Sequence, residues 1–321
     1  MKSQDFTYAV SRIRMKEKGL LTEKDIIRLV SQKDYPSVLR TLSELSFGDN
    51  HNSIDSIITS ETDKLWALMT ELTDDISAFD VFRIQNDYHN LKVCVKSVYS
   101  DTEPYSMFVS GGTIDADKLY EFIKNREYKE LSEDMGVVAS ASLDALLKTG
   151  DGQLCDAIID KATLEAVKKI GDGTPYDVIK DYAELFIASS DIKIAVRGSM
   201  LSKSYEFFTK SLCQCNSLNT ETLSKSAVKG FDEICTYLSS TKYKDAIDYI
   251  KASMSSFEKY CDNLLINGMK KQKYEPFSIG PLVAYIIAKQ NEIKAVRLVL
   301  IGKQNGLDDS KISERIRDMY V

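Results

Sequence analysis

Apolar residues recur at helical spacing along most of the chain, most clearly near its C-terminus. One apolar face there is formed by Leu282, Tyr285, Ile286, Ile293, Val296, Leu300 and Ile301. Residues three and four positions apart share one face of an α-helix. Gly280 and Pro281 suit a first turn, and Gly302 and Gly306 supply stop signals. The pattern predicts one long helix, followed by a last helix that starts near Asp308. The apolar run of the long helix is interrupted by Lys289, Glu292, Lys294 and Arg297.

The middle of this helix belongs to a motif that occurs three times at an interval of 101 residues. In each copy a polar residue precedes a branched apolar residue and a lysine. The copies are Asn90-Leu91-Lys92-Val93, Asp191-Ile192-Lys193-Ile194 and Glu292-Ile293-Lys294-Ala295. A fixed long interval indicates a repeated structural module, which favours a shaped scaffold over an enzyme with one active-site cleft. The segment Val93–Tyr99 alone resembles a strand, but its counterparts lie in helical patterns, so we predict helix there.

Two further landmarks accompany the repeat. Threonine or aspartate precedes an apolar helical run three times, which predicts helix N-caps. These segments are Thr22-Glu23-Lys24-Asp25, Thr113-Ile114-Asp115 and Thr220-Glu221-Thr222. A tyrosine then falls between two helical runs at Tyr35, Tyr128 and Tyr243. We interpret it as closing a tight corner between helices.

Composition supports an ordinary all-helical protein. Hydrophobic residues make up 43% of 321 residues, with only five prolines and fifteen glycines. The net charge of −6 argues against a nucleic-acid partner, because proteins that bind nucleic acids normally carry an excess of basic residues. The start, Met1–Asp5, has no apolar signal core, and the uncharged run Pro276–Ala288 is too short for a bilayer, which needs about 20 residues. We therefore expect a cytoplasmic chain without a membrane span.

Candidate catalytic and metal-binding residues are sparse. Phosphate-binding glycine motifs are missing, and we interpret Gly150-Asp151-Gly152 and Gly171-Asp172-Gly173 as turns between helices. His51 and His89 give little support for metal binding, and Cys213-x-Cys215 lacks the second pair of ligands that a zinc site needs. The six cysteines are expected to be reduced and mostly buried. They are Cys94, Cys155, Cys213, Cys215, Cys235 and Cys261.

One acidic group, Asp74-Asp75 with Asp80, resembles the magnesium-binding aspartates of all-helical enzymes. A solvated helix end explains it better, since no second aspartate cluster follows. Trp66 lies at helical spacing with Leu65 and Met69, which indicates core packing. We expect no cofactor and no metal.

The repeat cations allow two interpretations. They are Lys92, Lys96, Lys193, Arg197, Lys294 and Arg297. They are either solvated charges beside an apolar helix face, or equivalent positions that present a ring of positive charge to an acidic partner.

The chain resembles the C subunit of the bacterial and archaeal V/A-type rotary ATPases, which is the counterpart of the d subunit of eukaryotic V-ATPase. The likeness runs in order over the whole chain. It is carried by Tyr8-Ala9 with Arg12, Arg14 and Leu20-Leu21, by Asn86-Asp87-Tyr88-His89-Asn90-Leu91-Lys92, and by Glu275-Pro276, Pro281-Leu282, Ala284-Tyr285, Ala288-Lys289, Glu292-Ile293-Lys294-Ala295, Arg297 and Gly302-Lys303.

This resemblance implies three similar helical domains in a pseudo-threefold funnel, which we place at residues 1–110, 111–215 and 216–321. It implies a seat on the cytoplasmic face of the membrane proteolipid ring, with the shaft subunits D and F received in the funnel. It implies no active site, because ATP chemistry belongs to the A and B subunits. The expected function is a central-stalk adaptor that transmits torque for ATP-linked proton or sodium transport. A helical-repeat scaffold of another assembly, or a metal-dependent all-α enzyme using Asp74 and Asp75, are the alternatives.

Overall fold

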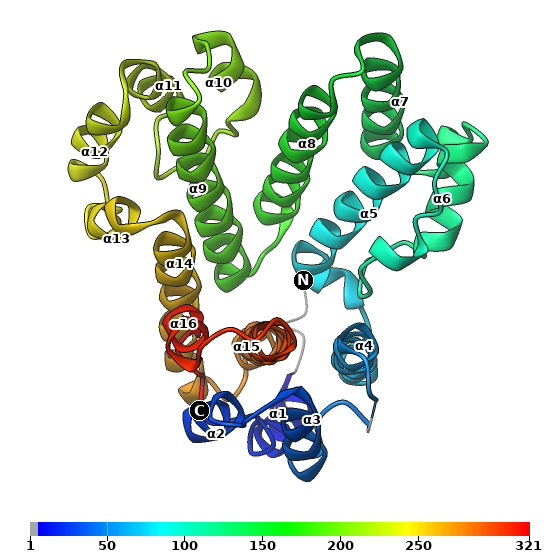
Figure 1. The fold of residues 1–321 in the computed structure, drawn as a ribbon, viewed down its shortest axis with the longest axis vertical. Helices are drawn as coiled ribbons and strands as arrows, with labels where there is room; N and C mark the ends of the chain where they lie inside the picture. Colours follow the sequence, from blue (N-terminus) through cyan, green and yellow to red (C-terminus); the bar gives the residue numbers. More distant parts are fainter. Residues whose placement is uncertain (1–5, 50) are drawn as a thin grey trace. The chain divides into compact units, whose positions relative to one another are not determined.

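The computed structural model describes residues 6–49 and 51–321, so the predicted features of Met1–Asp5 lie outside the described residues. Within those two ranges the regular structure consists of sixteen α-helices and four short 3-10 helices, without a β-strand (Figure 1). The predicted all-α class is confirmed.

The helices form two compact units. A terminal unit combines Met1–Ile76 with Asp248–Val321, and a central unit spans Ser77–Ile247. The three domains expected from the repeat, and their funnel arrangement, stay predictions.

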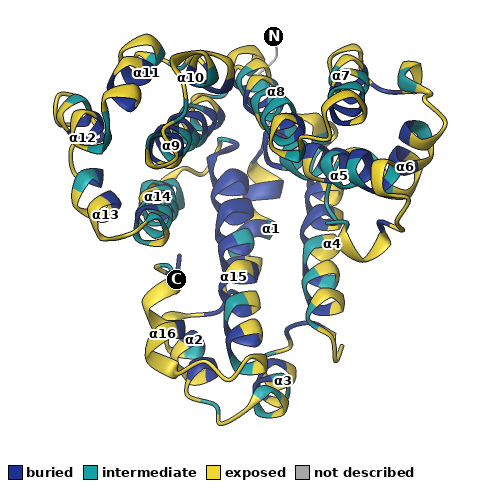
Figure 2. Ribbon diagram, turned by 45° about the horizontal axis from the view of Figure 1, so that its top comes forward, coloured by how far each residue is buried: buried dark blue, intermediate teal, exposed yellow. Residues whose placement is uncertain are grey.

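The terminal unit is organised around its longest helix, α15 (Gly280–Gln304). The other helices of this unit are α1 (Thr7–Glu17), α2 (Glu23–Val30), α3 (Tyr35–Glu44), α4 (Ile54–Leu72), α14 (Met254–Met269), η4 (Lys270–Tyr274) and α16 (Asp309–Arg315). All of them contact α15. A helix covered on several sides must be apolar around most of its circumference, and Figure 2 shows α15 largely buried.

The core of this unit joins residues from both ends of the chain. Ile26, Leu29 and Ile57 from the N-terminal helices pack in one cluster with Val296 and Leu300 of α15. Burying one such aliphatic side chain stabilises the fold by about 1.5–3 kcal/mol. The N-terminal helices therefore complete a core whose central helix lies near the C-terminus.

The central unit is built on three long helices, α5 (Asp80–Ser100), α8 (Gly152–Gly173) and α9 (Asp177–Met200). The remaining elements are η2 (Tyr105–Met107), α6 (Ala116–Lys124), η3 (Tyr128–Glu130), α7 (Glu133–Thr149), α10 (Tyr205–Ser211), α11 (Thr220–Lys229) and α12 (Phe231–Ser239). Two elements cross the unit boundaries, η1 (Ile76–Phe79) and α13 (Ala246–Ala252). Helix α8 packs on α5, α7 and α9, and α11 packs on α9. Leu91 and Val95 of α5 share a core with Leu143 of α7 and Ile159 of α8.

Two of the three predicted N-caps are confirmed. The Thr22 side chain accepts from Asp25 N in a capping box, and Asp115 accepts from Lys118 N. The third prediction was one residue late: Asn219 caps α11 by accepting from Thr222 N at 2.8 Å, and Thr220 is already helical. Asparagine caps a helix at least as well as threonine, which explains the shift.

The other predicted elements hold with two exceptions, the first being Gly302, which lies inside α15 instead of ending it. Val93–Tyr99 is helical, the three corner tyrosines lie at helix junctions, and Trp66 is buried. Gly150 ends α7 in the left-handed conformation, as a turn should. Gly171–Gly173, however, is wrong as a turn because it forms the last turn of α8. A Cβ on Gly171 would lie 2.6 Å from Ala183 Cβ, so this glycine permits the close packing of α8 on α9.

Candidate functional site

The polar residue of each repeat is buried and ties a long helix to a distant backbone segment. Asn90 exchanges two hydrogen bonds with the backbone of Val109, both at 2.9 Å. Asp191 accepts from Cys213 N at 3.0 Å, and Glu292 accepts from Leu21 N at 2.5 Å. Each tied segment precedes a capped helix, namely α6, α11 and α2. The same kind of hydrogen bond, from a long helix to a distant backbone segment, therefore recurs every 101 residues. The sequence shows the repeated motif but not this structural role.

Four of the six repeat cations form ion pairs at the surface. On α5, Lys92 lies 2.6 Å from Asp160 and Lys96 lies 2.7 Å from Asp156, both on α8. On α15, Lys294 is 3.6 Å from Asp262. Exposed ion pairs contribute only about 0–1 kcal/mol each. These cations can therefore exchange their present partners for others at small cost.

The remaining repeat cations differ from one another. Arg297 lies 4.0 Å from Asp55, at the limit of an ion pair. Lys193 is half-buried on α9, one turn before the exposed Arg197. The structure thus places each pair of cations one turn apart on its own long helix. Their use as a partner-binding ring stays a prediction.

A buried cluster of charges, which the sequence analysis missed, lies in the terminal unit. Lys289 Nζ is 2.6 Å from Glu61 of α4 and 2.5 Å from Glu292, and it lies 4.6 Å from the centre of the Phe47 ring. The Glu61 side chain is 4% exposed and that of Glu292 is 1% exposed. Gly48 N also donates to Glu61 at 2.9 Å.

Burial and charge oppose each other in this cluster. Burial alone would lower the pKa of Lys289, but Glu292 and Glu61 outweigh it and raise that pKa. Burial raises the pKa of Glu292, and Lys289 offsets this only in part. For Glu61 the effect of burial is overcome by Lys289, and its pKa falls. The available signal was the i, i+3 spacing of Lys289 and Glu292, together with the alignment of Glu292 with Asn90 and Asp191.

The enzyme-like candidates do not come together. Among the described residues, no three His, Cys, Asp or Glu side chains are grouped as a metal site. His51 and His89 are exposed, and Asp74 and Asp75 are exposed just beyond the end of α4. All six cysteines are free, and four of them are buried, as expected.

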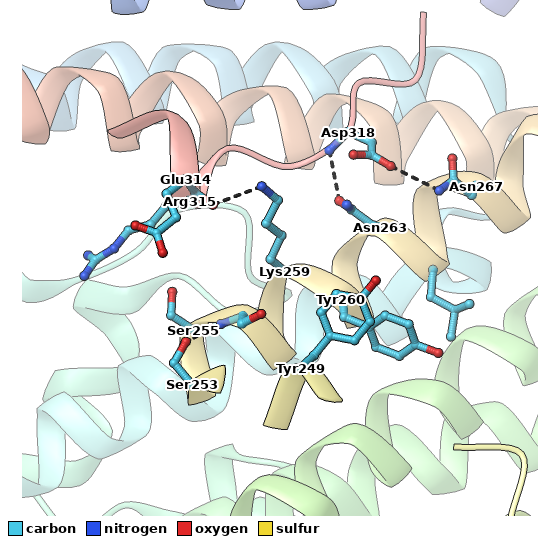
Figure 3. A pocket seen from close by; sticks show the side chains of 12 residues that line it. Tyr249, Ser253, Ser255, Lys259, Tyr260, Asn263, Asn267, Glu314, Arg315 and Asp318 are labelled. Carbon is cyan, nitrogen blue, oxygen red and sulfur yellow. Dashed lines mark hydrogen bonds between the residues drawn. The ribbon is translucent and has the colours of Figure 1, made fainter. Parts of the chain in front are cut away.

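A surface pocket of about 630 Å³ lies between α14, α16 and the C-terminal segment (Figure 3). Lys259 Nζ donates to the carbonyl of Glu314, Asp318 N donates to Asn263, and Asn267 donates to the Asp318 carboxylate. These polar groups fasten the C-terminal segment onto α14.

Two aromatic side chains stand out on the segment before α15, Tyr274 at the end of η4 and Phe277 in the loop that follows. Tyr274 is 86% exposed and Phe277 is 70% exposed. η4 is anchored, since Arg14 donates to the carbonyls of Gln272 and Lys273 at 3.0 and 2.7 Å, and Lys273 donates to the carbonyl of Tyr320. Exposed aromatic groups on an anchored segment are typical of a protein-binding surface.

Over residues 6–49 and 51–321, no helix has both the length and the apolar character that are needed to cross a bilayer.

Comparison with known proteins places the chain in a family. It is 22% identical over 268 residues to the C subunit of the V-type sodium ATPase of Enterococcus hirae, a match that covers 82% of this chain and 81% of that protein. It is 20% identical over 338 residues to the C subunit of the A-type ATP synthase of Methanocaldococcus jannaschii, covering 96% and 85%. The corresponding A-type ATP synthase protein of Haloquadratum walsbyi is 21% identical over 345 residues, with 96% of each chain covered. The family model of the ATP synthase (C/AC39) subunit matches residues 9–315. Because this match extends from α1 to the end of α16, the chain belongs to the family of ATP synthase (C/AC39) subunits of V/A-type ATPases.

Proposed function

We propose that this protein is the non-catalytic central-stalk adaptor of a rotary V/A-type ATPase. It couples the shaft subunits D and F to the membrane proteolipid ring from the cytoplasmic side, and it transmits torque for ATP-linked proton or sodium transport. The observation that carries the proposal is the family match over residues 9–315, which leaves almost no part of the chain for a separate function.

Packing supports a mechanical role. A coupling between a shaft and a ring must resist twisting, and closely packed helices deform little. Helix α15 has 25 residues and is about 37 Å long at 1.5 Å per residue. It is packed against seven other elements of the terminal unit. Such a helix can carry load along its length without bending away from its neighbours.

The repeat cations are the proposed partner-binding residues. A body with three similar modules cannot make equivalent contacts with an asymmetric shaft and with a ring of another symmetry. We therefore expect polar contacts that are individually weak and differ from module to module. Lys92, Lys96, Lys294 and Arg297 fit this expectation, because their ion pairs at the surface are weak and exchangeable.

The first test is co-purification from membranes. The tagged chain is captured before and after a low-salt wash, and the bound proteins are identified. Rotary ATPase subunits, D and F among them, are expected in the captured fraction. Their absence, with capture of a different assembly, would show that the helical body serves as a scaffold elsewhere.

The second test reverses the repeat lysines. Lys92→Glu, Lys193→Glu and Lys294→Glu together should weaken partner binding about tenfold to a hundredfold, since each lost contact is worth up to about 1 kcal/mol. ATP hydrolysis should then continue while ion transport falls. Hydrolysis and transport are measured on the same membranes.

The matched control changes the net charge by the same amount elsewhere. Lys148, Lys210 and Lys225 are exposed lysines in i, i+4 ion pairs outside the repeat. Their replacement by glutamate should leave coupling intact. Equal coupling in both triple variants would count against the repeat cations as partner-binding residues.

A further inference from the structure

Asp191 has an unsatisfied oxygen in the interior of the central unit. The residue is 0% exposed on α9. One carboxylate oxygen, Oδ1, accepts from Cys213 N at 3.0 Å, while Oδ2 has no hydrogen-bond partner. A buried acceptor without a partner is costly, and a buried negative charge without one is costlier still.

The equivalent position in the first repeat shows what is missing. Asn90 lies 101 residues earlier, and its Oδ1 accepts from Val109 N just as Asp191 accepts from Cys213 N. Asn90 also has an Nδ2 group, which donates to the Val109 carbonyl at 2.9 Å. The asparagine therefore satisfies both backbone groups of the segment that it ties. An ionised aspartate has no proton to donate in the same place, whereas a neutral carboxyl has one.

In the third repeat the buried carboxylate is paired with a cation. Glu292 is as deeply buried as Asp191, but both of its oxygens have partners, Leu21 N and the Lys289 ammonium group. It can therefore stay ionised beside a cation. No ion pair of this kind reaches Asp191 among the described residues of the central unit.

The charged groups nearest Asp191 contact other partners, although the charge of Lys161 lowers the pKa of Asp191 and that of Glu184 raises it. From α8, Lys161 donates to the carbonyl of Leu212 and lies 3.6 Å from Glu165, and Lys168 lies 3.0 Å from Asp172. On α9 itself, Glu184 accepts from the backbone N–H groups of Asn216 and Ser217.

Burial keeps the two thiols of the tied segment neutral, and Lys242 in the corner before α13 acts on Glu184, whose pKa it lowers. Burial raises the pKa of the Cys213 thiol to about 11 and also raises the pKa of Cys215. Tyr243, from the corner before α13, shares a hydrogen bond with Ser217 at 2.9 Å. Among the described residues, the Asp191 carboxyl thus accepts one hydrogen bond, from Cys213 N, and forms no ion pair, and burial outweighs the effect of Lys161 on its pKa.

We propose that Asp191 is a buried proton-binding site. Its neutral carboxyl replaces the amide of Asn90, with Oδ2–H donating to the carbonyl of Cys213. Loss of the proton leaves an unpaired charge in the core and loosens the segment between α10 and α11. Proton uptake is thereby linked to the order of this segment, and the site does not depend on which partners the chain has.

The pH dependence follows from linkage. Burial raises the pKa of Asp191 from 3.8 to about 7. Between these values the folded chain keeps a proton that the unfolded chain has released, so stability falls as the pH rises through this window and the loss is complete above it. From pH 5 to pH 8 this group should raise the unfolding equilibrium constant by about 100-fold.

The test compares Asp191→Asn with the wild type in urea unfolding from pH 5 to pH 8. Asparagine keeps the shape and supplies the missing donor permanently. The ratio of the two unfolding constants should therefore change by about 100-fold over this range, and the variant should be the more stable protein at pH 8. Infrared spectra of the wild type at pH 6 should show a protonated-carboxyl band that the variant lacks.

Asp87→Asn is the matched control, because Asp87 is equally buried on α5. Burial raises the pKa of Asp87, but both of its oxygens have donors, because they accept from Thr113 N, Ile114 N and Thr113 Oγ1. This variant should be less stable than the wild type at pH 8, because an amide nitrogen cannot accept these hydrogen bonds. The proposal is overturned if Asp191→Asn fails to fold, if it is destabilised at pH 8 as Asp87→Asn is, or if the infrared band persists in it.

Discussion

Replacement of Lys289 by methionine tests whether the buried charge cluster holds the terminal unit together. Methionine keeps the length and most of the volume of lysine but removes the ammonium group. Glu61 and Glu292 then lose the cation that lies 2.6 and 2.5 Å from them, while their side chains stay 4% and 1% exposed. Breaking a buried ion pair on one side costs about 3–5 kcal/mol, because an uncompensated charge is left in the core.

The loss should be large enough to measure by two methods. For a unit of about 150 residues, 3–5 kcal/mol corresponds to a fall in Tm of roughly 6–20 °C. Urea unfolding followed by circular dichroism gives the free energy directly. The loss should be larger at pH 8 than at pH 5. Without Lys289 the folded pKa of Glu61 rises above its unfolded value and that of Glu292, which is already raised, rises further, so stability is lost as the pH increases.

Lys64→Met is the matched control. Lys64 lies 2.7 Å from the same Glu61 carboxylate, but its side chain is 42% exposed. Removing a solvent-screened charge should cost about 1 kcal/mol or less. The triple variant with Lys289→Met, Glu61→Gln and Glu292→Gln should recover part of the loss, since no buried charge remains. A loss at Lys289 no greater than that at Lys64, or one that does not vary with pH, would refute the reasoning.

Two further outcomes are expected. Gly136→Ala places a Cβ 2.6 Å from the Tyr128 carbonyl oxygen and should lower the free energy of unfolding in urea by about 1–3 kcal/mol. The control Gly173→Ala meets nothing within 4 Å and should be neutral or slightly stabilising. Equal effects of the two changes would show that the backbone shifts at Gly136 to make room. The double variant Tyr274→Ser, Phe277→Ser should change the free energy of unfolding by less than about 0.5 kcal/mol but reduce co-purification with rotary ATPase subunits. Undiminished co-purification would show that this segment does not bind those subunits.

Much of the fold could be predicted because helices depend on apolar periodicity and capping residues that can be read from a short stretch of sequence. The spacing of Leu282, Ile286, Ile293 and Leu300 predicted α15 within a few residues, and a capping box marked the start of α2. The Gly171–Gly173 segment was misread for the same reason. Two glycines beside an aspartate look like a turn locally, and only the close approach of α9 explains why they continue a helix.

The site was harder to predict, because burial of a polar residue depends on distant parts of the chain. The 101-residue interval pointed to the right helices but drew attention to the lysines, which lie at the surface. The geometry that the three repeats share belongs instead to the preceding polar residue, whose partners are Val109, Cys213 and Leu21. No local pattern shows that Leu21 N meets a carboxylate that is 271 residues away.

The sequence by itself determined the helical class, the ends of several helices, and a motif that occurs three times, because these depend on periodicity and on caps a few residues apart. The tertiary structure alone decided which charges are buried and how they are satisfied. Lys289 looks like an ordinary break in an apolar face until α4 and the Phe47–Gly48 turn cover it. At all three positions the side chain accepts a hydrogen bond from a distant backbone N–H. The acceptor is a neutral amide at Asn90, a cation-paired carboxylate at Glu292 and, in our proposal, a protonated carboxyl at Asp191. Desolvation by distant helices sets this difference, since it determines which protonation state the interior can hold.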